Sequence, residues 1–300
     1  MTNATTTLPA GSSPGDAGPG PAQIQSAFAR TLRGGPVLIS LFILALVIFV
    51  AILAPWLHTV DPTAINPGVR LKPITGAHWL GTDAYGRDVF SRVLYGARVS
   101  LIVGLGVAVF SMATGLAIGV VAGYFRWIDA IVMRVMDGLM AIPGILLAIA
   151  LVSLSGASLM TVMIAITVPE VPRVVRLVRS VILSVRNEPY VEAAVALGTP
   201  TFTLMLRHLV PNTIAPLVVQ GTYVFASAIL TEAILSFLGA GVPPETSSWG
   251  NIMAEGRAYF QLLPGLVLYP GVLLSLTVLS VNVLGDAMRD ALDPRMSRRL

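Results

Sequence analysis

Six long runs of mostly apolar residues decide what this 300-residue chain can fold into. A helix needs about 20 such residues to cross the hydrocarbon core of a membrane. The composition agrees, because 55% of the residues are hydrophobic and only 11% are charged, whereas about 25% are charged in soluble proteins. We therefore expect an all-α polytopic membrane protein with six transmembrane helices. The predicted spans lie near residues 36–57, 99–124, 131–155, 158–181, 213–240 and 263–285.

The basic residues predict how these spans are oriented. Arg30 and Arg33 directly precede the first apolar run, and arginine and lysine collect on the cytoplasmic side of membrane proteins. If both termini are cytoplasmic, the larger part of the 19 arginine and lysine residues falls on that side. The residues on the outer side are then Arg70, Lys72, Arg87, Arg92, Arg98 and Arg257. This bias places the segment 188–212, between the fourth and fifth spans, in the cytoplasm.

Composition also predicts how the chain is divided. Residues 1–35 are expected to form a disordered cytoplasmic tail, because their Gly, Pro, Ser and Thr content provides no apolar segment of the kind a signal peptide needs. Residues 36–98 contain the first span and an outer loop, and residues 99–286 contain the transmembrane core. Residues 287–300 are expected to form a cytoplasmic C-terminal tail.

Several kinds of functional site are excluded. The chain has no cysteine, which excludes disulfides, thiolate metal sites and a cysteine nucleophile. Lys72 is its only lysine and does not lie in a Gly-rich phosphate-binding loop, so the chain cannot bind ATP through a P-loop. His58, His78 and His208 are far apart and form no zinc-protease pattern. We expect no catalytic residue, metal or cofactor on this chain.

The segment 188–212 reads EPYVEAAVALGTPTFTLMLRHLVPN and predicts two short helices joined by a turn. Asn187 is suited to cap the first helix, and Pro189 is suited to its first turn. Gly198 ends that helix. A Thr-Pro pair then starts a second helix, which Pro211 is expected to close.

The first of these helices has the features of a docking surface. Ala193 and Ala194 leave the backbone thinly covered, and Tyr190 and Leu197 provide apolar anchors seven residues apart. Such a helix could dock into a groove of a partner protein. The hairpin could equally rest on the membrane interface. The physical properties of the residues leave both interpretations open.

The spacing within this segment resembles the cytoplasmic EAA loop of the permease subunits of bacterial ABC importers. In that family the loop forms a coupling helix that sits in a cleft of the ATPase subunit. The resemblance therefore implies a set of residues that couple this chain to an ATPase. They are Tyr190, Glu192, Ala193, Ala194, Gly198, His208 and Pro211.

Three further stretches resemble the C-type permease of dipeptide, oligopeptide and nickel importers: residues 78–101, 230–257 and 282–295. The resemblance implies the type I ABC importer fold, a bacterial inner-membrane location and peptides as cargo. It also implies a second homologous permease, ATP-binding subunits that hold ATP and Mg, and an extracytoplasmic substrate-binding protein. Membrane lipids would surround the assembly, and no nucleic acid is involved. Nickel chelates, glutathione and other small solutes remain open as cargo.

Three residues are candidates for the pathway or its gate. A charge near the bilayer centre costs about 3 kcal/mol and must face protein or water. Glu232 could therefore line the pathway or bind a neighbouring helix. Glu170 lies between Pro169 and Pro172, where we expect a kink or local unwinding. Trp249 is expected in an outer loop folded back at the membrane interface.

Two other charged groups have simpler interpretations. Asp83, Arg87 and Asp88 are expected to form a salt-bridged turn, because the arginine between the aspartates argues against a metal site. Arg134 and Asp137 are three residues apart and are expected to pair within one helix.

These observations favour a transport subunit powered by separate ATPases, because the chain has a docking segment and no nucleotide motif. The alternative is a secondary transporter or channel driven by an ion gradient, with Glu170 and Glu232 as a proton relay. A membrane-embedded hydrolase is disfavoured, because the histidines fall near the ends of spans or in loops.

Overall fold

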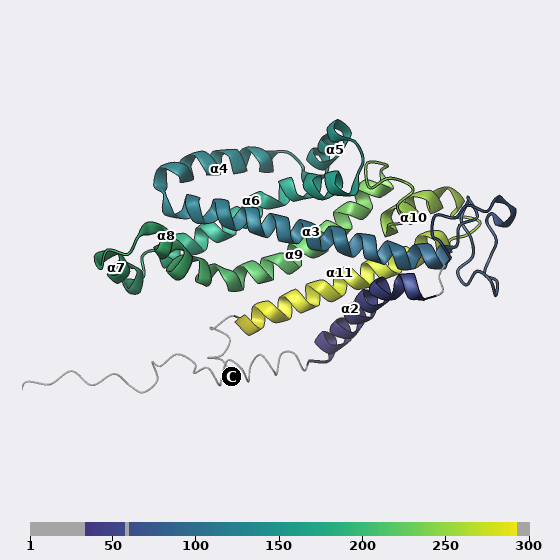
Figure 1. Cartoon of the computed structure of the whole chain (residues 1–300), viewed down its shortest axis with the longest axis horizontal. Helices are drawn as coiled ribbons and strands as arrows, with labels where there is room; N and C mark the ends of the chain where they lie inside the picture. Colours follow the sequence, from purple (N-terminus) through teal and green to yellow (C-terminus); the bar gives the residue numbers. More distant parts are fainter. Residues whose placement is uncertain (1–33, 58–59, 293–300) are drawn as a thin grey trace, which may run out of the picture.

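The computed structural model describes residues 34–57 and 60–292, and the regular secondary structure of this part of the chain is helical. Most of the two predicted tails, at residues 1–35 and 287–300, lies outside the described residues, as does His58. Residues 287–292 of the second tail are helical. Long helices run along one common axis in Figure 1. They are α2 (Gly35–Leu53), α3 (Val89–Tyr124), α6 (Leu159–Val185), α9 (Val210–Phe237) and α11 (Gly265–Leu292).

α3 is the central helix of the bundle. It packs mainly against α6 and α9, while α2 packs against α11 and α3. The helices α7 (Pro189–Ala196) and α8 (Thr201–Leu204) lie at one end of the bundle, and α10 (Trp249–Gly256) lies toward the other (Figure 1). We call these the hairpin end and the α10 end.

Among the described residues, four continuous helical segments are long and apolar enough to cross a membrane. They are Gly35–Trp56, Val89–Tyr124, Thr201–Phe237 and Gly265–Leu292. The second begins about ten residues before the predicted start at residue 99. The Asp88 carboxylate accepts a hydrogen bond of 2.8 Å from the Ser91 N–H, which caps the helix at this earlier position.

The third predicted span, 131–155, is broken into two helices. α4 (Arg126–Ala141) and α5 (Gly144–Ser155) meet at an angle of 90°. Pro143 explains the break, because the residue before a proline is driven out of the helical region, and Ile142 is extended, with φ −94° and ψ 129°. By composition this bent pair can form one broken span.

α6 corresponds to the fourth predicted span, but it is not among the helices that are apolar enough by composition to cross a membrane. It carries Glu170, Arg173, Arg176 and Arg179. It also stays helical through its two internal prolines, so the local unwinding expected there does not occur.

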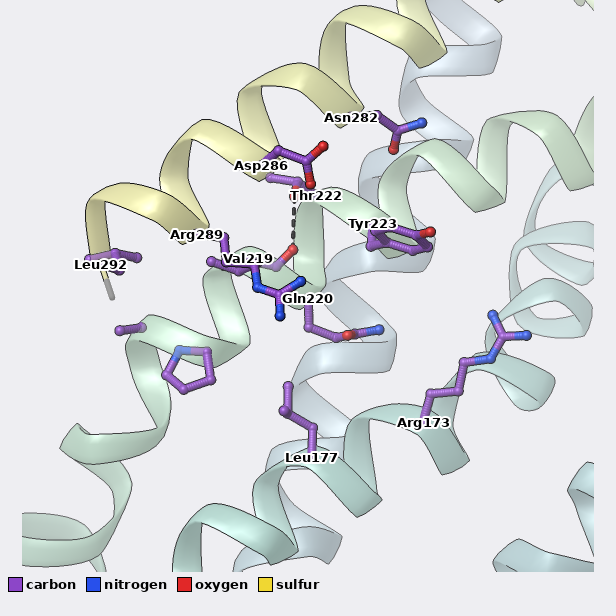
Figure 2. A pocket seen from close by; sticks show the side chains of 13 residues that line it. Arg173, Leu177, Val219, Gln220, Thr222, Tyr223, Asn282, Asp286, Arg289 and Leu292 are labelled. Atoms are coloured by element: carbon purple, nitrogen blue, oxygen red, sulfur yellow. Dashed lines mark hydrogen bonds between the residues drawn. The ribbon is translucent and has the colours of Figure 1, made fainter. Parts of the chain in front are cut away.

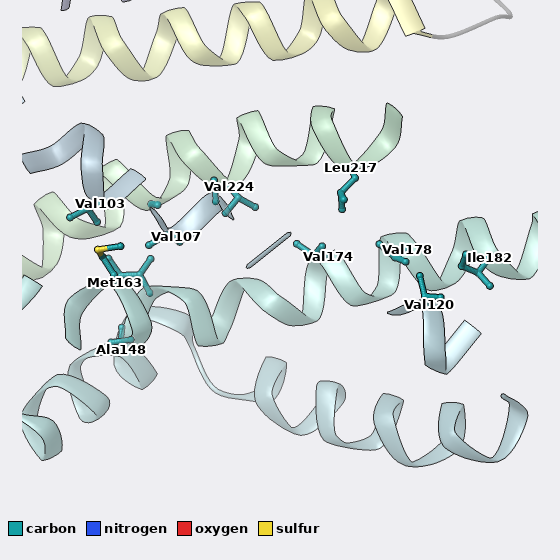
Figure 3. Packing of buried hydrophobic residues seen from close by; sticks show 14 of the residues in the cluster. Val103, Val107, Val120, Ala148, Met163, Val174, Val178, Ile182, Leu217 and Val224 are labelled. Carbon is teal, nitrogen blue, oxygen red and sulfur yellow. The ribbon is translucent and has the colours of Figure 1, made fainter. Parts of the chain in front are cut away.

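The contact between α3 and α6 is built from glycine. Glycines recur every fourth residue on α3 and meet β-branched residues that recur every fourth residue on α6. The facing pairs are Gly115–Val174, Gly119–Val178 and Gly123–Ile182. Small residues let helix backbones approach closely in a membrane, where packing replaces the hydrophobic driving force. Figure 3 shows the α6 residues of these pairs within the main apolar core.

Candidate functional site

The segment between α6 and α9 forms the predicted hairpin at the end of the bundle (Figure 1). Gly198 ends α7 with a positive φ of 79°. Its N–H donates to the Val195 carbonyl at 2.9 Å, and the Thr199 N–H donates to the Ala194 carbonyl at 3.1 Å. These bonds satisfy the last carbonyls of the helix. The predicted role of Gly198 in the turn is confirmed.

Two other predictions about the hairpin are wrong. Asn187 does not cap α7, because its side-chain amide donates back to the Leu183 carbonyl at 3.3 Å and Glu188 occupies the N-cap position. Pro211 does not close the second helix, because the chain passes through a π-helical turn at Met205–Leu209 directly into α9. A proline ring clashes with the carbonyl four residues earlier in an α-helix, and the wider π turn relieves that clash.

The hairpin is fixed to the bundle by apolar and polar contacts. Val191 and Ala194 are buried and belong to the main apolar core. The rings of Tyr190 and His208 are 6.3 Å apart. The Asn212 amide joins them, since it donates to the Tyr190 hydroxyl at 3.1 Å and to the His208 carbonyl at 2.6 Å. Asn212 was not among the predicted site residues, although its position four residues after His208 on one continuous helical segment was a usable signal.

The opposite side of the hairpin exposes large apolar side chains. Leu197 is 87% exposed and Phe202 is 72% exposed, and Val195 and Leu206 are more than half exposed. We call these four residues the apolar hairpin surface. Glu192 is also exposed beside them. Exposed apolar patches of this kind mark interaction sites.

The structure places Glu232 in a contact between helices. Its side chain is fully buried on α9. The Ser236 hydroxyl donates to it at 2.8 Å, and the Ser100 hydroxyl of α3 donates to it at 3.3 Å. The geometry therefore matches the alternative in which Glu232 binds a neighbouring helix.

Trp249 packs inside the protein and does not present its indole to a membrane interface. Its side chain is fully buried, and its indole N–H donates to the Val93 carbonyl of α3 at 3.1 Å. Gly96 makes this burial possible, because a Cβ at that position would lie 3.1 Å from the indole ring. Trp249 thus packs α10 against α3.

The predicted salt-bridged turn exists within a larger buried network at the α10 end. The Asp83 carboxylate accepts hydrogen bonds of 2.6 Å from both the Arg87 Nε and the Arg92 Nη1. Glu255 of α10 accepts from the same two arginines, at 2.7 Å from Arg92. Asp88 instead caps α3 and contacts the His78 Nδ1 at 2.9 Å. Nothing in the sequence pointed to Glu255.

Comparison with known proteins identifies the family. Residues 115–298 match the family described as "binding-protein-dependent transport system inner membrane component". Residues 23–73 match the "N-terminal TM domain of oligopeptide transport permease C". The chain belongs to this permease family. It is an ABC importer permease, a multi-pass protein of the bacterial inner membrane, and the alternative of an ion-gradient-driven transporter is not favoured.

Individual relatives cover most of the chain. The permease is 50% identical over 268 residues to a probable peptide ABC transporter permease of Sinorhizobium fredii, covering 89% of this chain and 90% of the relative. It is 40% identical over 273 residues to a dipeptide transport system permease protein of Alkalihalophilus pseudofirmus, covering 91% and 90%. It is 39% identical over 223 residues to a glutathione transport system permease protein of Pectobacterium atrosepticum, covering 74% of each chain.

Two arginines of α6 in this permease are paired with aspartates of α4. The Arg176 Nη2 donates to Asp137 at 2.5 Å, and the Arg179 Nη2 donates to Asp129 at 2.6 Å. The predicted pairing of Asp137 with Arg134 is therefore wrong, because the partner comes from another helix. Pairing of this kind lowers the cost of charges in a helix that lies within a membrane bundle.

Two grooves open beside α6 and α9. The larger has a volume of about 870 Å³ and lies between α6, α9 and α11 (Figure 2). The smaller has a volume of about 450 Å³ and lies against the bend between α4 and α5. Glu170 lines the smaller groove, where the Ser227 hydroxyl donates to it at 3.1 Å. Arg173 lines both grooves, whereas Glu232 and Trp249 line neither.

Proposed function

We propose that this chain is one of two permease subunits of an ATP-driven importer of peptides, and that its hairpin couples the pore to the ATPases. The apolar hairpin surface is the observation that carries this proposal. Leu197 and Phe202 are the most exposed residues of this surface, and the hairpin's helix α7 projects beyond the bundle (Figure 1). An ATPase that covers them would remove a large apolar area from water.

The same hairpin is suited to transmit force. Val191 and Ala194 are locked into the core shared with α3 and α6, and the second hairpin helix runs without interruption into α9. Movement of the hairpin by ATP-driven closure of the ATPases would therefore rotate or shift α9 with it. In this proposal Glu192, Ala193, Gly198 and Pro211 shape the docked surface and its lever, and ATP and Mg bind only to the partner subunits.

The proposed topology has six crossings with both termini in the cytoplasm. The bent pair α4–α5 and the charged helix α6 would each make one crossing, along with α2, α3, α9 and α11. The paired charges between α4 and α6 support this, because they allow α6 to cross as part of a bundle. The hairpin end would then face the cytoplasm, and the α10 end would face the substrate-binding protein.

Peptides are the proposed cargo because relatives of high identity carry peptide or dipeptide transport in their names. Glutathione, itself a small peptide, is named for another relative. The substrate-binding protein would make the first selection among such cargoes.

The test replaces Leu197 or Phe202 by Glu in the full importer. We expect the amount of ATPase that co-purifies with the permease to fall at least about tenfold, because a buried charge at an interface hot spot costs about 2 kcal/mol or more. Peptide uptake should fall in parallel. Ile74→Glu is the matched control, because Ile74 is 63% exposed but lies at the α10 end. Unchanged ATPase binding by both hairpin variants would refute the proposal.

A second experiment tests the orientation. Because the chain has no cysteine, Leu197→Cys provides a single thiol at the hairpin. In intact cells that make the permease without its ATPases, a membrane-impermeant maleimide should leave the thiol unlabelled, and it should label the thiol once the cells are opened. Ile74→Cys should behave in the opposite way. Labelling of Leu197→Cys from outside would overturn the topology.

A further inference from the structure

A line of hydrogen-bonding side chains follows one face of α9. Gln220, Tyr223, Ser227 and Thr231 are three and four residues apart, which places them one above the other on a helix. The first two line the larger groove and the last two line the smaller groove. Arg173 of α6 belongs to the walls of both grooves, so it connects the two parts of this row of side chains.

The neighbouring helices extend this polar character. Asn282 of α11 lines the larger groove opposite Tyr223 (Figure 2). We call Arg173, Gln220, Tyr223, Ser227, Thr231 and Asn282 the polar track. Asp286 and Arg289, of opposite charge, line the same groove toward the hairpin end.

Much of the polar track has no partner of its own. Gln220, Tyr223 and Asn282 make no side-chain hydrogen bond within residues 34–57 and 60–292, and Tyr223 is 64% exposed. Transfer of an unpaired amide or hydroxyl into hydrocarbon costs about 4–8 kcal/mol. The face of α9 that carries the track is therefore unsuited to lipid.

The contrast with α3 supports this conclusion. The large side chains exposed in the middle of α3 are all apolar, namely Ile102, Leu105, Val109 and Phe110, and Leu105 is 59% exposed. Thr114 is exposed too, but its hydroxyl is satisfied within the helix, since it donates to the Phe110 carbonyl at 2.6 Å. Lipid can cover that face without leaving a polar group unpaired. The polar-track residues of α9 thus share one face, which needs water or a polar ligand in front of it.

The Glu170–Arg173 pair lies where the two grooves meet. The Arg173 Nη1 is 3.3 Å from both carboxylate oxygens of Glu170, which is a long and weak contact, and the Arg173 side chain is 54% exposed. A guanidinium has five N–H donors and binds a carboxylate best through two parallel hydrogen bonds. Arg173 therefore keeps donors that another carboxylate can use.

We propose that the polar track is this permease's wall of the peptide path, and that Arg173 holds the free carboxylate of the peptide in transit. The neutral amide, phenol and hydroxyl groups of the track both donate and accept, which matches the alternating donors and acceptors of a peptide backbone. In this proposal the site does not select among the side chains of the peptide. The inference rests on the proposed function and assigns it to particular residues.

Thiol labelling tests the path. Gln220→Cys, Tyr223→Cys and Ser227→Cys each give a single thiol in this chain, and Leu105→Cys is the lipid-facing control. The importer is reconstituted with its ATPases and binding protein in liposomes, and a charged methanethiosulfonate is followed by the mass of this chain. We expect labelling of the track residues, no labelling of the control, and at least about tenfold slower track labelling during ATP-driven turnover with saturating dipeptide.

Each other outcome overturns the inference. If the track thiols react as slowly as Leu105→Cys, that face is a dry contact with the second permease or with lipid. If they react but the dipeptide has no effect, the face is wet but does not form the peptide path. If the unaltered importer takes up no peptide, the proposed function itself fails, so the two failures are distinguishable.

Arg173 has a separate test. In Arg173→Gln we expect the maximal rate of dipeptide uptake to fall at least about tenfold. The half-saturating peptide concentration should not change, because the binding protein sets it. Arg173→Lys should recover part of the rate, since it keeps the charge but loses the paired hydrogen bonds. Uptake by Arg173→Gln equal to that of the unaltered importer, or an equal loss in Glu170→Gln, would show that Arg173 does not bind the carboxylate.

Discussion

Replacement of Gly119 by Ala probes the contact on which the α3–α6 packing depends. A Cβ at this position would lie 2.7 Å from the Val178 Cβ, 2.9 Å from the Val178 Cγ1 and 3.0 Å from the Val175 carbonyl oxygen. The Val178 Cβ and the carbonyl are fixed to the backbone, so no change of rotamer relieves the clash. The two helices must therefore move apart.

The magnitude follows from a comparison with Gly138 on α4, where a Cβ would meet nothing within 4 Å. Alanine gains up to about 1 kcal/mol over glycine in a helix, and this gain applies to both variants. The difference between them isolates the overpacking, which costs about 1–3 kcal/mol. At about 2–4 °C per kcal/mol, Gly119→Ala should melt several degrees below Gly138→Ala.

The assay is the apparent thermal midpoint of the purified complex in detergent. The double variant Gly115→Ala, Gly119→Ala should lose less than the sum of the single losses. Once the helices have separated to accommodate one added methyl group, the second fits at a lower cost. The stability losses at these neighbouring sites are therefore not additive. Equal midpoints for Gly119→Ala and Gly138→Ala would refute the close-packing argument.

Three further predictions concern other parts of the chain. Arg92→Met should lower the stability of the complex by up to about 3–5 kcal/mol, because it leaves Asp83 and Glu255 with only one arginine, Arg87, to neutralise both carboxylates. Arg98→Met, at an exposed position, should have little effect on the thermal midpoint. If Arg92→Met and Arg98→Met lowered the midpoint equally, the buried network around Arg92 would not be stabilising. In the same measurement Trp249→Ala should cost about 3–5 kcal/mol and Trp249→Phe only about 1 kcal/mol. A small loss for Trp249→Ala would contradict the burial of the indole. Gly198→Ala should cost about 1–2 kcal/mol through its left-handed conformation and weaken peptide-stimulated ATP hydrolysis, and Gly198→Asn should restore most of that hydrolysis.

The sequence predicted the features that depend on short stretches of chain. Hydropathy identified most of the long helices, because about 20 apolar residues in a row have few stable environments other than a membrane. The turn at Gly198 was predictable because glycine readily adopts a positive φ. The break between α4 and α5 was also a local signal, from Pro143, but the length of the apolar run concealed it.

The continuation of the hairpin into α9 was harder to predict. Pro211 usually ends a helix, and only the π-helical turn at Met205–Leu209 lets the chain pass it. The width of a helical turn depends on packing around it, and Met205 and Leu209 are both buried in the core. The sequence alone therefore favoured a helix end at Pro211, where the structure has one continuous helical segment.

Pairing between distant segments was decided only by the tertiary structure. Asp137 could pair with Arg134 on its own helix, but Arg176 of α6 lies closer. Glu255 joins Arg92 across 163 positions of sequence, and Trp249 is buried because Gly96 opens a place for it on α3. The sequence determined that this chain enters a membrane and carries a hairpin, because hydropathy and backbone preference are local properties. Which charges meet and which face of α9 stays polar depend on how the helices pack, because those contacts exist only once distant segments are side by side.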